Sequence, residues 1–133
     1  MASRVRWVDF DCADPYLVAS FWSEATGMRH HPDNKPGDEE CALLSGTDVL
    51  EGGMLFQRVE EGKVVKNRVH LDLQPTDRTR DEEIERLLRS GAVLVADHRN
   101  PDGTGWGVLA DPEGNEFCVE RSVAERAATT PPA

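Results

Sequence analysis

The stretch 67–73, Asn-Arg-Val-His-Leu-Asp-Leu, decides our prediction of the fold. Its apolar and ionisable side chains alternate strictly, with Val69, Leu71 and Leu73 set against Arg68, His70 and Asp72. This period of two predicts a strand over residues 68–73 that packs one face against a core and presents the other to a pocket. The stretch lies near the middle of the chain, and the same order of elements is predicted on either side of it.

Length, charge and cysteine content limit the class of protein. The chain has 133 residues, 38% of them hydrophobic, which is enough for one domain with a substantial core. Its formal net charge of -10 argues against nucleic acid and against a membrane surface as partners. Because no apolar run could span a bilayer and no signal-peptide pattern opens the chain, we expect a cytoplasmic protein. The three widely spaced cysteines predict reduced thiols.

The first half of the chain predicts a strand, a helix and three further strands. The first strand is expected at 4–12. Asp14-Pro15 is typical of a helix start, and Gly27 is typical of the residue that ends a helix. The later strands are expected at 28–31, 41–45 and 53–59.

The second half repeats this order. We expect a strand at 68–73, a helix at 77–90 and strands at 92–97, 106–110 and 116–120, with a tight turn at 111–114. Overlaying the halves pairs Val8 with Leu71 and Phe56 with Phe117.

This repeat predicts an α+β fold of two βαβββ modules, 4–59 and 68–120, which form a single domain over residues 1–122. Each module covers only one face of its sheet, so two are expected to combine and to leave a cleft between curved mixed sheets. A short helical turn is expected at 123–128, and residues 127–133 are expected to fray within a C-terminal tail at 123–133.

With the repeat in view, the chain resembles the vicinal oxygen chelate superfamily, which includes glyoxalase I, extradiol dioxygenases and bleomycin-binding proteins. The resemblance runs from residue 5 to residue 120, and small bacterial glyoxalase-like proteins are the most similar in pattern. The most specific marker is the stretch 111–117, Asp-Pro-Glu-Gly-Asn-Glu-Phe. Two weaker markers are the stretch 68–72 and Phe21-Trp22 ahead of Gly27, where the family usually has Phe-Tyr ahead of Leu-Gly.

The resemblance implies four metal-ligand positions, which fall here on Trp7, Gln57, His70 and Cys118. In the superfamily, such ligands hold a divalent ion that keeps open positions for two substrate oxygens. His70 fits as a ligand, and Gln57 could supply a neutral oxygen. Trp7 cannot ligate, and Cys118 is a soft donor in a hard-donor site. A divalent metal therefore remains a possible cofactor, although the usual set of four ligands is not present.

His70 and Cys118 are the candidate catalytic residues. His70 could act as a general acid or base, and its alternative is a packed or hydrogen-bonded side chain. Cys118 could act as a thiolate nucleophile beside His70, which requires a lowered thiol pKa. Its alternative is a small buried apolar side chain.

A second set of residues could bind the substrate or ligand: Trp7, Asp9, Gln57, Asp72, Trp106 and Glu120. Trp7 and Trp106 could stack on a flat molecule. Four carboxylates could form an oxygen-rich metal site with His70, or an acidic wall that selects a cationic or hydrogen-bond-donating ligand: Asp9, Asp72, Glu116 and Glu120. Alternatively, Glu116 and Glu120 are solvated carboxylates at the rim. The alternative for Asp72 is an ion pair with Arg68 or Arg6.

Two functional hypotheses follow. The first is a glyoxalase-like lyase or isomerase that acts on a small oxygenated metabolite, with His70 as acid, base or ligand. The second is a binding protein without chemistry, which holds an antibiotic-type small molecule. The resemblance also implies a homodimer, since small members of the superfamily often pair two chains.

Overall fold

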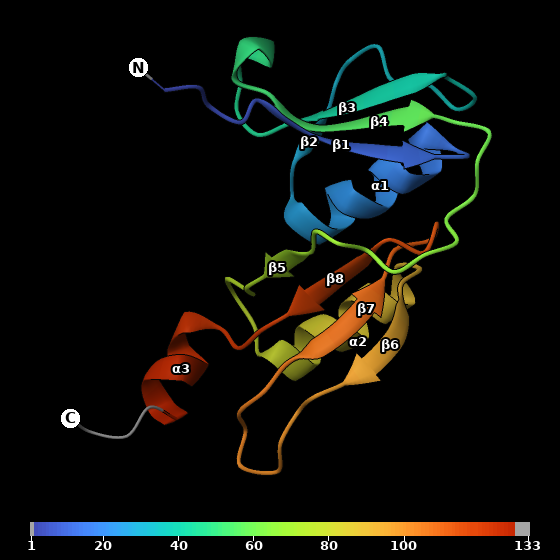
Figure 1. The fold of residues 1–133 in the computed structure, drawn as a ribbon. Coiled ribbons are helices and arrows are strands. Elements are labelled where there is room, and N and C mark those ends of the chain that lie inside the picture. The colour runs from blue at the N-terminus through green and yellow to red at the C-terminus, as the bar shows by residue number, and fades with distance from the viewer. Residues whose placement is uncertain (1, 130–133) are drawn as a thin grey trace. The chain divides into compact units, whose positions relative to one another are not determined.

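The computed structural model describes residues 2–129, which form two compact units that divide after Lys63 (Figure 1). Each unit contains one four-stranded mixed sheet. The predicted α+β class is therefore confirmed. Within the described residues, no helix combines the length and the apolar character needed to cross a membrane. Residues 127–129, which were predicted to fray, belong to a helix instead. The rest of the predicted tail, from position 130 onward, lies outside the described residues.

The first unit contains β1 (Trp7–Cys12), α1 (Pro15–Thr26), β2 (Arg29–His30), β3 (Glu40–Leu44), the 3-10 turn η1 (Val49–Glu51) and β4 (Gly53–Arg58). Its sheet has the order β1-β4-β3-β2, in which β1 runs parallel to β4 and the other pairs are antiparallel. Helix α1 contacts β2, β3 and β4. The core of this unit lies between the helix and one face of the sheet.

Helix α1 keeps its predicted bounds because both ends are capped as the sequence indicates. The Asp14 carboxylate accepts a hydrogen bond from the Leu17 N–H at 3.3 Å, and a proline opens the first turn. Gly27 adopts φ +75° and donates its N–H to the Ser23 carbonyl at 2.8 Å, so the chain reverses there. Between these caps, Trp22 is buried against the Phe10 ring.

The second unit contains β5 (Leu71–Leu73), α2 (Arg80–Arg89), β6 (Val93–Asp97), β7 (Gly107–Ala110), β8 (Glu116–Val119) and α3 (Val123–Thr129). Its sheet has the order β5-β8-β7-β6, with β5 parallel to β8. Fully buried apolar side chains join α2 to this sheet: Ile84, Leu87, Leu109, Phe117 and Val119. The opposite face of the sheet carries the polar side chains of the predicted site.

Helix α2 begins later than predicted, at Arg80 instead of residue 77. The reason is a capping box, in which the Thr79 hydroxyl accepts the Glu82 N–H at 3.1 Å and the Glu82 carboxylate accepts the Thr79 N–H at 2.9 Å. The two bonds fix Thr79 as the residue that starts the helix.

Strand β5 is shorter than predicted, because residues 68–70 lie outside it. Val69 is 78% exposed, so its predicted place in the core is wrong. The Glu116 backbone N–H donates to the Asn67 side-chain oxygen at 3.1 Å, and not to a backbone carbonyl of a longer β5. The Asn67 carbonyl then accepts the His70 ring Nε2–H at 3.1 Å. These contacts hold residues 67–70 in a turn that ends the ladder at Leu71.

The two strand registers correct the predicted overlay of the halves. Phe56 lies opposite Phe10 in the first sheet, and Phe117 lies opposite Leu71 in the second. If the two phenylalanines correspond, then Leu71 corresponds to Phe10 and not to Val8. By the same shift of two residues, His70 corresponds to Asp9 and not to Trp7.

Gly52 provides a test of the first unit. A Cβ atom there would lie 1.8 Å from the Arg6 carbonyl oxygen, whereas a Cβ at Gly37, which has the same φ of +88°, would meet nothing within 4 Å. We expect Gly37→Ala to lower the free energy of unfolding by about 1–2 kcal/mol through backbone strain alone. Gly52→Ala should cost at least about twice as much because it adds the clash. Urea unfolding followed by circular dichroism measures both, and equal losses would contradict the close approach.

Candidate functional site

A groove with a volume of about 730 Å³ lies on the second unit, and all of its lining residues belong to that unit. Five predicted site residues line it: His70, Asp72, Trp106, Cys118 and Glu120. The other three, Trp7, Asp9 and Gln57, lie on β1 and β4 of the first unit. The groove therefore brings together five of the eight predicted site residues.

The floor of the groove is a row of three side chains across the sheet. Asp72 on β5 lies opposite Cys118 on β8, and Cys118 lies opposite Val108 on β7. Because side chains alternate along strands, this row points away from the face that carries Phe117 and Leu109. The prediction that Asp72 lies on the polar face is confirmed by this register.

Cys118 is half-buried in the floor, and its surroundings disfavour the thiolate. Burial raises the pKa of the Cys118 thiol, and the charge of Asp72 and a hydrogen bond to the Asp72 carboxylate raise it further. The neighbouring Lys66 ammonium opposes this shift only in part. A thiolate nucleophile needs a lowered thiol pKa, so this environment does not support the predicted role of Cys118 as a nucleophile.

His70 is exposed in the turn before β5, with one ring nitrogen engaged. Its Nε2 lies 3.1 Å from the Asn67 carbonyl. A carbonyl only accepts hydrogen bonds, so Nε2 carries the proton in this contact and Nδ1 is the acceptor of the neutral ring. Within residues 2–129, Nδ1 has no hydrogen-bond partner. The ring can therefore accept a proton or a hydrogen bond from a molecule in the groove.

Trp106 and His98 form an aromatic pair at one wall of the groove. Their ring centroids lie 5.0 Å apart with a tilt of 36°, and Trp106 remains 45% exposed. The His98 N–H donates to the Trp106 carbonyl at 2.9 Å, which continues the β6–β7 pairing beyond the strands. A Cβ at Gly105 would lie 2.0 Å from the His98 carbonyl oxygen, so glycine permits this close approach. His98 was not among the predicted site residues. Its place opposite Trp106 across the β6–β7 hairpin is the signal that marks it.

The carboxylates near the groove do not form a bare acidic wall. Glu116 lies 3.0 Å from the Lys66 ammonium, and Glu120 lies 3.4 Å from the Arg126 guanidinium. Asp9 belongs to the first unit, where burial and then the charges of Asp11 and Glu40 raise the pKa of its carboxyl. Most of the negative charge that was predicted to select a cationic ligand is therefore paired with cations or lies outside the groove.

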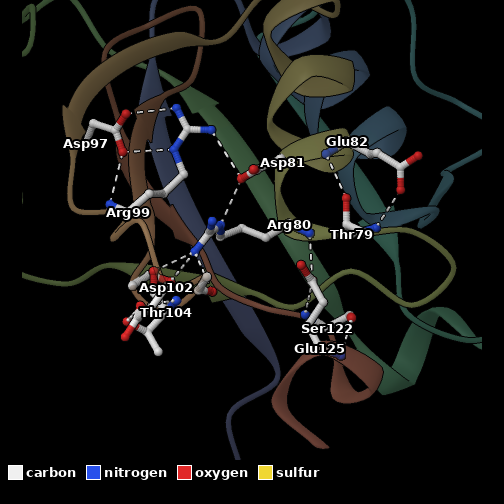
Figure 2. A network of polar contacts seen from close by, with 12 residues as sticks. Thr79, Arg80, Asp81, Glu82, Asp97, Arg99, Asp102, Thr104, Ser122 and Glu125 are labelled. Carbon is white, nitrogen blue, oxygen red and sulfur yellow. Dashed lines mark hydrogen bonds and ion pairs between the residues drawn. The ribbon is translucent and has the colours of Figure 1, made fainter. Parts of the chain in front are cut away.

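Arg80, which is only 4% exposed, anchors the loop that carries the aromatic wall. Its guanidinium Nη1 donates to the carbonyls of Gly103, Thr104 and Gly105 at 3.3, 2.9 and 3.0 Å. Its backbone N–H donates to the Glu125 carboxylate at 2.8 Å, which ties the start of α2 to α3. Figure 2 shows Arg80 between these two segments.

A second arginine extends this network to the end of β6. The Arg99 guanidinium donates to Asp97 at 2.8 Å and to Asp81 at 3.3 Å (Figure 2). Its hydrogen bonds hold the pKa of the Asp97 carboxyl well below its ordinary value. Asp81 also accepts the Arg80 Nε–H at 3.0 Å, so one carboxylate joins both guanidiniums. The loop at 98–106 is thus held by Arg80 from α2 and by Arg99 from the loop itself.

The implied metal centre does not fit the residues at the four positions. Trp7 offers only an N–H donor, and the corrected register replaces it with Asp9, a carboxyl of the first unit whose pKa is raised by burial and by the charges of Asp11 and Glu40. Burial and the neighbouring Asp72 raise the pKa of the Cys118 thiol, which disfavours the thiolate that a metal would need. The Gln57 amide nitrogen donates to Glu40 at 3.0 Å. Among residues 2–129, no group of three His, Cys, Asp or Glu side chains is arranged to hold a metal ion.

Comparisons with known proteins agree with this architecture. The family model described as "Glyoxalase-like domain" matches residues 7–120. The chain therefore belongs to the glyoxalase-like domain family, and the resemblance to the vicinal oxygen chelate superfamily is confirmed. No curated protein sequence gives a significant match.

Solved structures share the fold at low sequence identity. A glyoxalase/bleomycin resistance protein/dioxygenase family enzyme from Burkholderia phytofirmans PsJN is 17% identical over 91% of this chain and 99% of its own, with a TM-score of 0.64. The fosfomycin resistance protein FosX from Mesorhizobium loti is 16% identical over 96% and 99%, with a TM-score of 0.66. FosX from Listeria monocytogenes is 13% identical over 96% and 99%, with a TM-score of 0.67.

Replacing Arg80 tests the anchor of the groove wall. We expect Arg80→Met to lower the free energy of unfolding by about 2–3 kcal/mol, because three carbonyls lose a charged donor. Amide exchange at His98 and Asn100 should accelerate at least about tenfold, which hydrogen exchange with mass spectrometry measures. Arg78→Met is the matched control, since Arg78 pairs with the exposed Asp77. Unchanged exchange at both amides in Arg80→Met would contradict the anchor.

Proposed function

We propose that this protein binds a small molecule that contains a flat ring, and that the ring lies against Trp106 in the groove of the second unit. The observation that carries the proposal is the state of Trp106, a residue that is 45% exposed while its indole lies against the His98 ring. An exposed aromatic side chain in a fixed position is a surface on which a second ring can stack.

The rest of the groove supports this proposal. Its volume of about 730 Å³ falls within the range of roughly 300–1,000 Å³ that small-molecule sites occupy. Val108 and Cys118 give the floor an apolar centre, while Asn100 and Thr104 supply polar atoms at the wall. An apolar centre with a few polar groups is the arrangement that orients a drug-sized molecule.

A relative with a bound small molecule adds support from outside this chain. The Listeria FosX structure is that of a mutant protein complexed with Mn(II) and 1S,2S-dihydroxypropylphosphonic acid. At 13% identity, this relative shows that the shared fold can hold a small oxygenated molecule, and nothing about which one this chain holds. The expected homodimer and the cytoplasmic location also remain predictions.

A second candidate function, acid or base catalysis by His70, is favoured by one observation. The Nδ1 atom of its neutral ring is an acceptor without a partner among the described residues, and the side chain lines the groove. A lyase or isomerase needs such a group to remove or return a proton. Cys118 is not part of this candidate because its raised pKa keeps the thiol protonated.

Trp106 variants test the binding proposal. A panel of neutral bicyclic heteroaromatics, titrated by isothermal calorimetry, should contain compounds that bind the wild type with millimolar affinity or better. We expect Trp106→Ala to weaken them at least about tenfold because the stacking surface is lost. Trp106→Phe, which keeps a ring, should weaken them by only about twofold to threefold. Affinity that is the same in all three proteins would contradict binding at this wall.

The catalytic candidate has a separate test. In D₂O, the wild type should promote exchange of the carbon-bound hydrogens beside the carbonyl in small hydroxyketones or keto acids, followed by proton NMR. We expect His70→Ala to slow this exchange by about 100-fold, since a positioned acid or base contributes roughly that much. His70→Ala should leave the affinity for the aromatic probes within about twofold, because the stacking surface is unchanged. Exchange at the same rate in His70→Ala would remove His70 from this role.

A further inference from the structure

We infer that the ring held against Trp106 belongs to a cationic, amino-substituted heteroaromatic molecule that donates its N–H groups to the Asp72 carboxylate. The inference rests on the proposed function and names its ligand class. It gives Asp72, on the floor of the groove, the role of selecting the ligand by charge.

The cations that line the groove are already matched by carboxylates, so they leave no excess of positive charge for an anionic ligand. Each of the three cationic side chains of the lining faces one carboxylate: Lys66 lies 3.0 Å from Glu116, Arg126 lies 3.4 Å from Glu120, and the charge of Arg121 acts on Asp102. The sign of the charge that the groove attracts therefore depends on the carboxylate that remains in the lining.

Asp72 is the carboxylate of the lining that remains. Within residues 2–129, its side chain forms no ion pair, and its hydrogen-bond partner is the Cys118 thiol. Because a thiol is a neutral and weak donor, it leaves the charge of Asp72 uncompensated and most acceptor positions of the two oxygens open. The floor of the groove therefore carries a negative charge that a cationic ligand can neutralise.

His70, two residues before Asp72, adds a second acceptor to the groove. The Nδ1 atom of its neutral ring has no hydrogen-bond partner in the described part of the chain. A molecule with several N–H groups complements these acceptors, whereas a carboxylate or phosphate group, which only accepts, does not. The hydrogen-bonding groups and the charge of the floor therefore favour the same class of ligand.

The stacking surface and this carboxylate lie within reach of one molecule. Asp72 is separated from Val108 by strand β8, so the two lie about 10 Å apart at roughly 4.8 Å per strand. Trp106 precedes Val108 by two residues, which is about 7 Å along an extended chain. A drug-sized molecule can therefore place its ring on the indole and its amino group at Asp72.

Three probes with the same bicyclic ring separate the effect of charge from stacking. Near neutral pH, 4-aminoquinoline is cationic, quinoline is neutral and quinoline-4-carboxylate is anionic. Calorimetry with the wild type should give the tightest binding for 4-aminoquinoline, at least about fivefold tighter than quinoline, and the weakest for the carboxylate. Raising the salt concentration from about 50 to about 500 mM should remove most of the advantage of the cation, because salt screens exposed charges.

An uncharged variant of the same shape tests Asp72. We expect Asp72→Asn to reduce the preference for 4-aminoquinoline over quinoline to within about twofold, since only the attraction of the indole face for a cation is then left. Glu85→Gln is the matched control, because Glu85 is an exposed carboxylate of α2 outside the groove lining. It should keep the full preference. Circular dichroism checks that both variants fold, and the salt series on the wild type needs no variant.

Alkylation of Cys118 reports whether the probe lies over the floor. Cys118 lines the groove, whereas Cys12 and Cys41 are buried. At a 4-aminoquinoline concentration of roughly ten times its Kd, about nine-tenths of the sites are occupied, so alkylation of Cys118 by N-ethylmaleimide should slow at least about fivefold. Mass spectrometry of the peptide that contains Cys118 measures the rate. An unchanged rate would place the probe elsewhere and overturn the inference.

The outcomes distinguish this inference from the function on which it rests. Equal affinity for the three probes, or tightest binding of the carboxylate, would overturn the inference and leave ring binding at Trp106 intact. A full preference for the cation in Asp72→Asn would also overturn it. If none of the three probes binds and the heteroaromatic panel also fails, the proposed function falls and the inference falls with it.

Discussion

The second unit depends on one buried guanidinium. A hairpin loop that leaves the sheet has carbonyl groups that need hydrogen-bond donors, because a buried carbonyl without one is costly. Arg80 supplies a donor to three consecutive carbonyls, those of residues 103–105, from the first turn of α2. Its own charge is balanced by Asp81, which lies 3.0 Å away. The loop is thereby fixed to a helix, and the aromatic wall of the groove is formed before any ligand arrives.

Local signals in the sequence predicted the fold well where short-range chemistry controls it. Asp14 and Gly27 mark the ends of α1 because each acts on neighbouring backbone groups. The turn at 111–114 was predictable because the Asp111 carboxylate accepts the N–H groups of Glu113 and Asn115 at 2.9 and 3.0 Å. Such contacts are contained in a few adjacent residues, so one sequence is enough to find them.

Contacts between distant residues limited the prediction elsewhere. Alternation alone extended β5 back to residue 68, but the Asn67 side chain bonds to Glu116, 49 positions away, and ends the strand. The predicted site residues Asp72, Trp106 and Cys118 all line the groove. Strand periodicity puts Asp72 and Cys118 on the same face of the sheet, whereas Trp106 lies just before β7. His98 was not among the predicted residues, because its contact with the Trp106 ring is visible only in the folded chain.

The hydrogen bond between Cys118 and Asp72 also affects how the groove withstands oxidation. Peroxides and electrophiles react with the thiolate form of cysteine, and the Asp72 carboxylate keeps this sulfur in its protonated form. The floor should therefore resist conversion to a sulfenic or sulfinic acid, which would place a bulky polar group in the groove. A partly exposed cysteine with a low pKa is open to oxidation, and the raised pKa of Cys118 acts in the opposite direction.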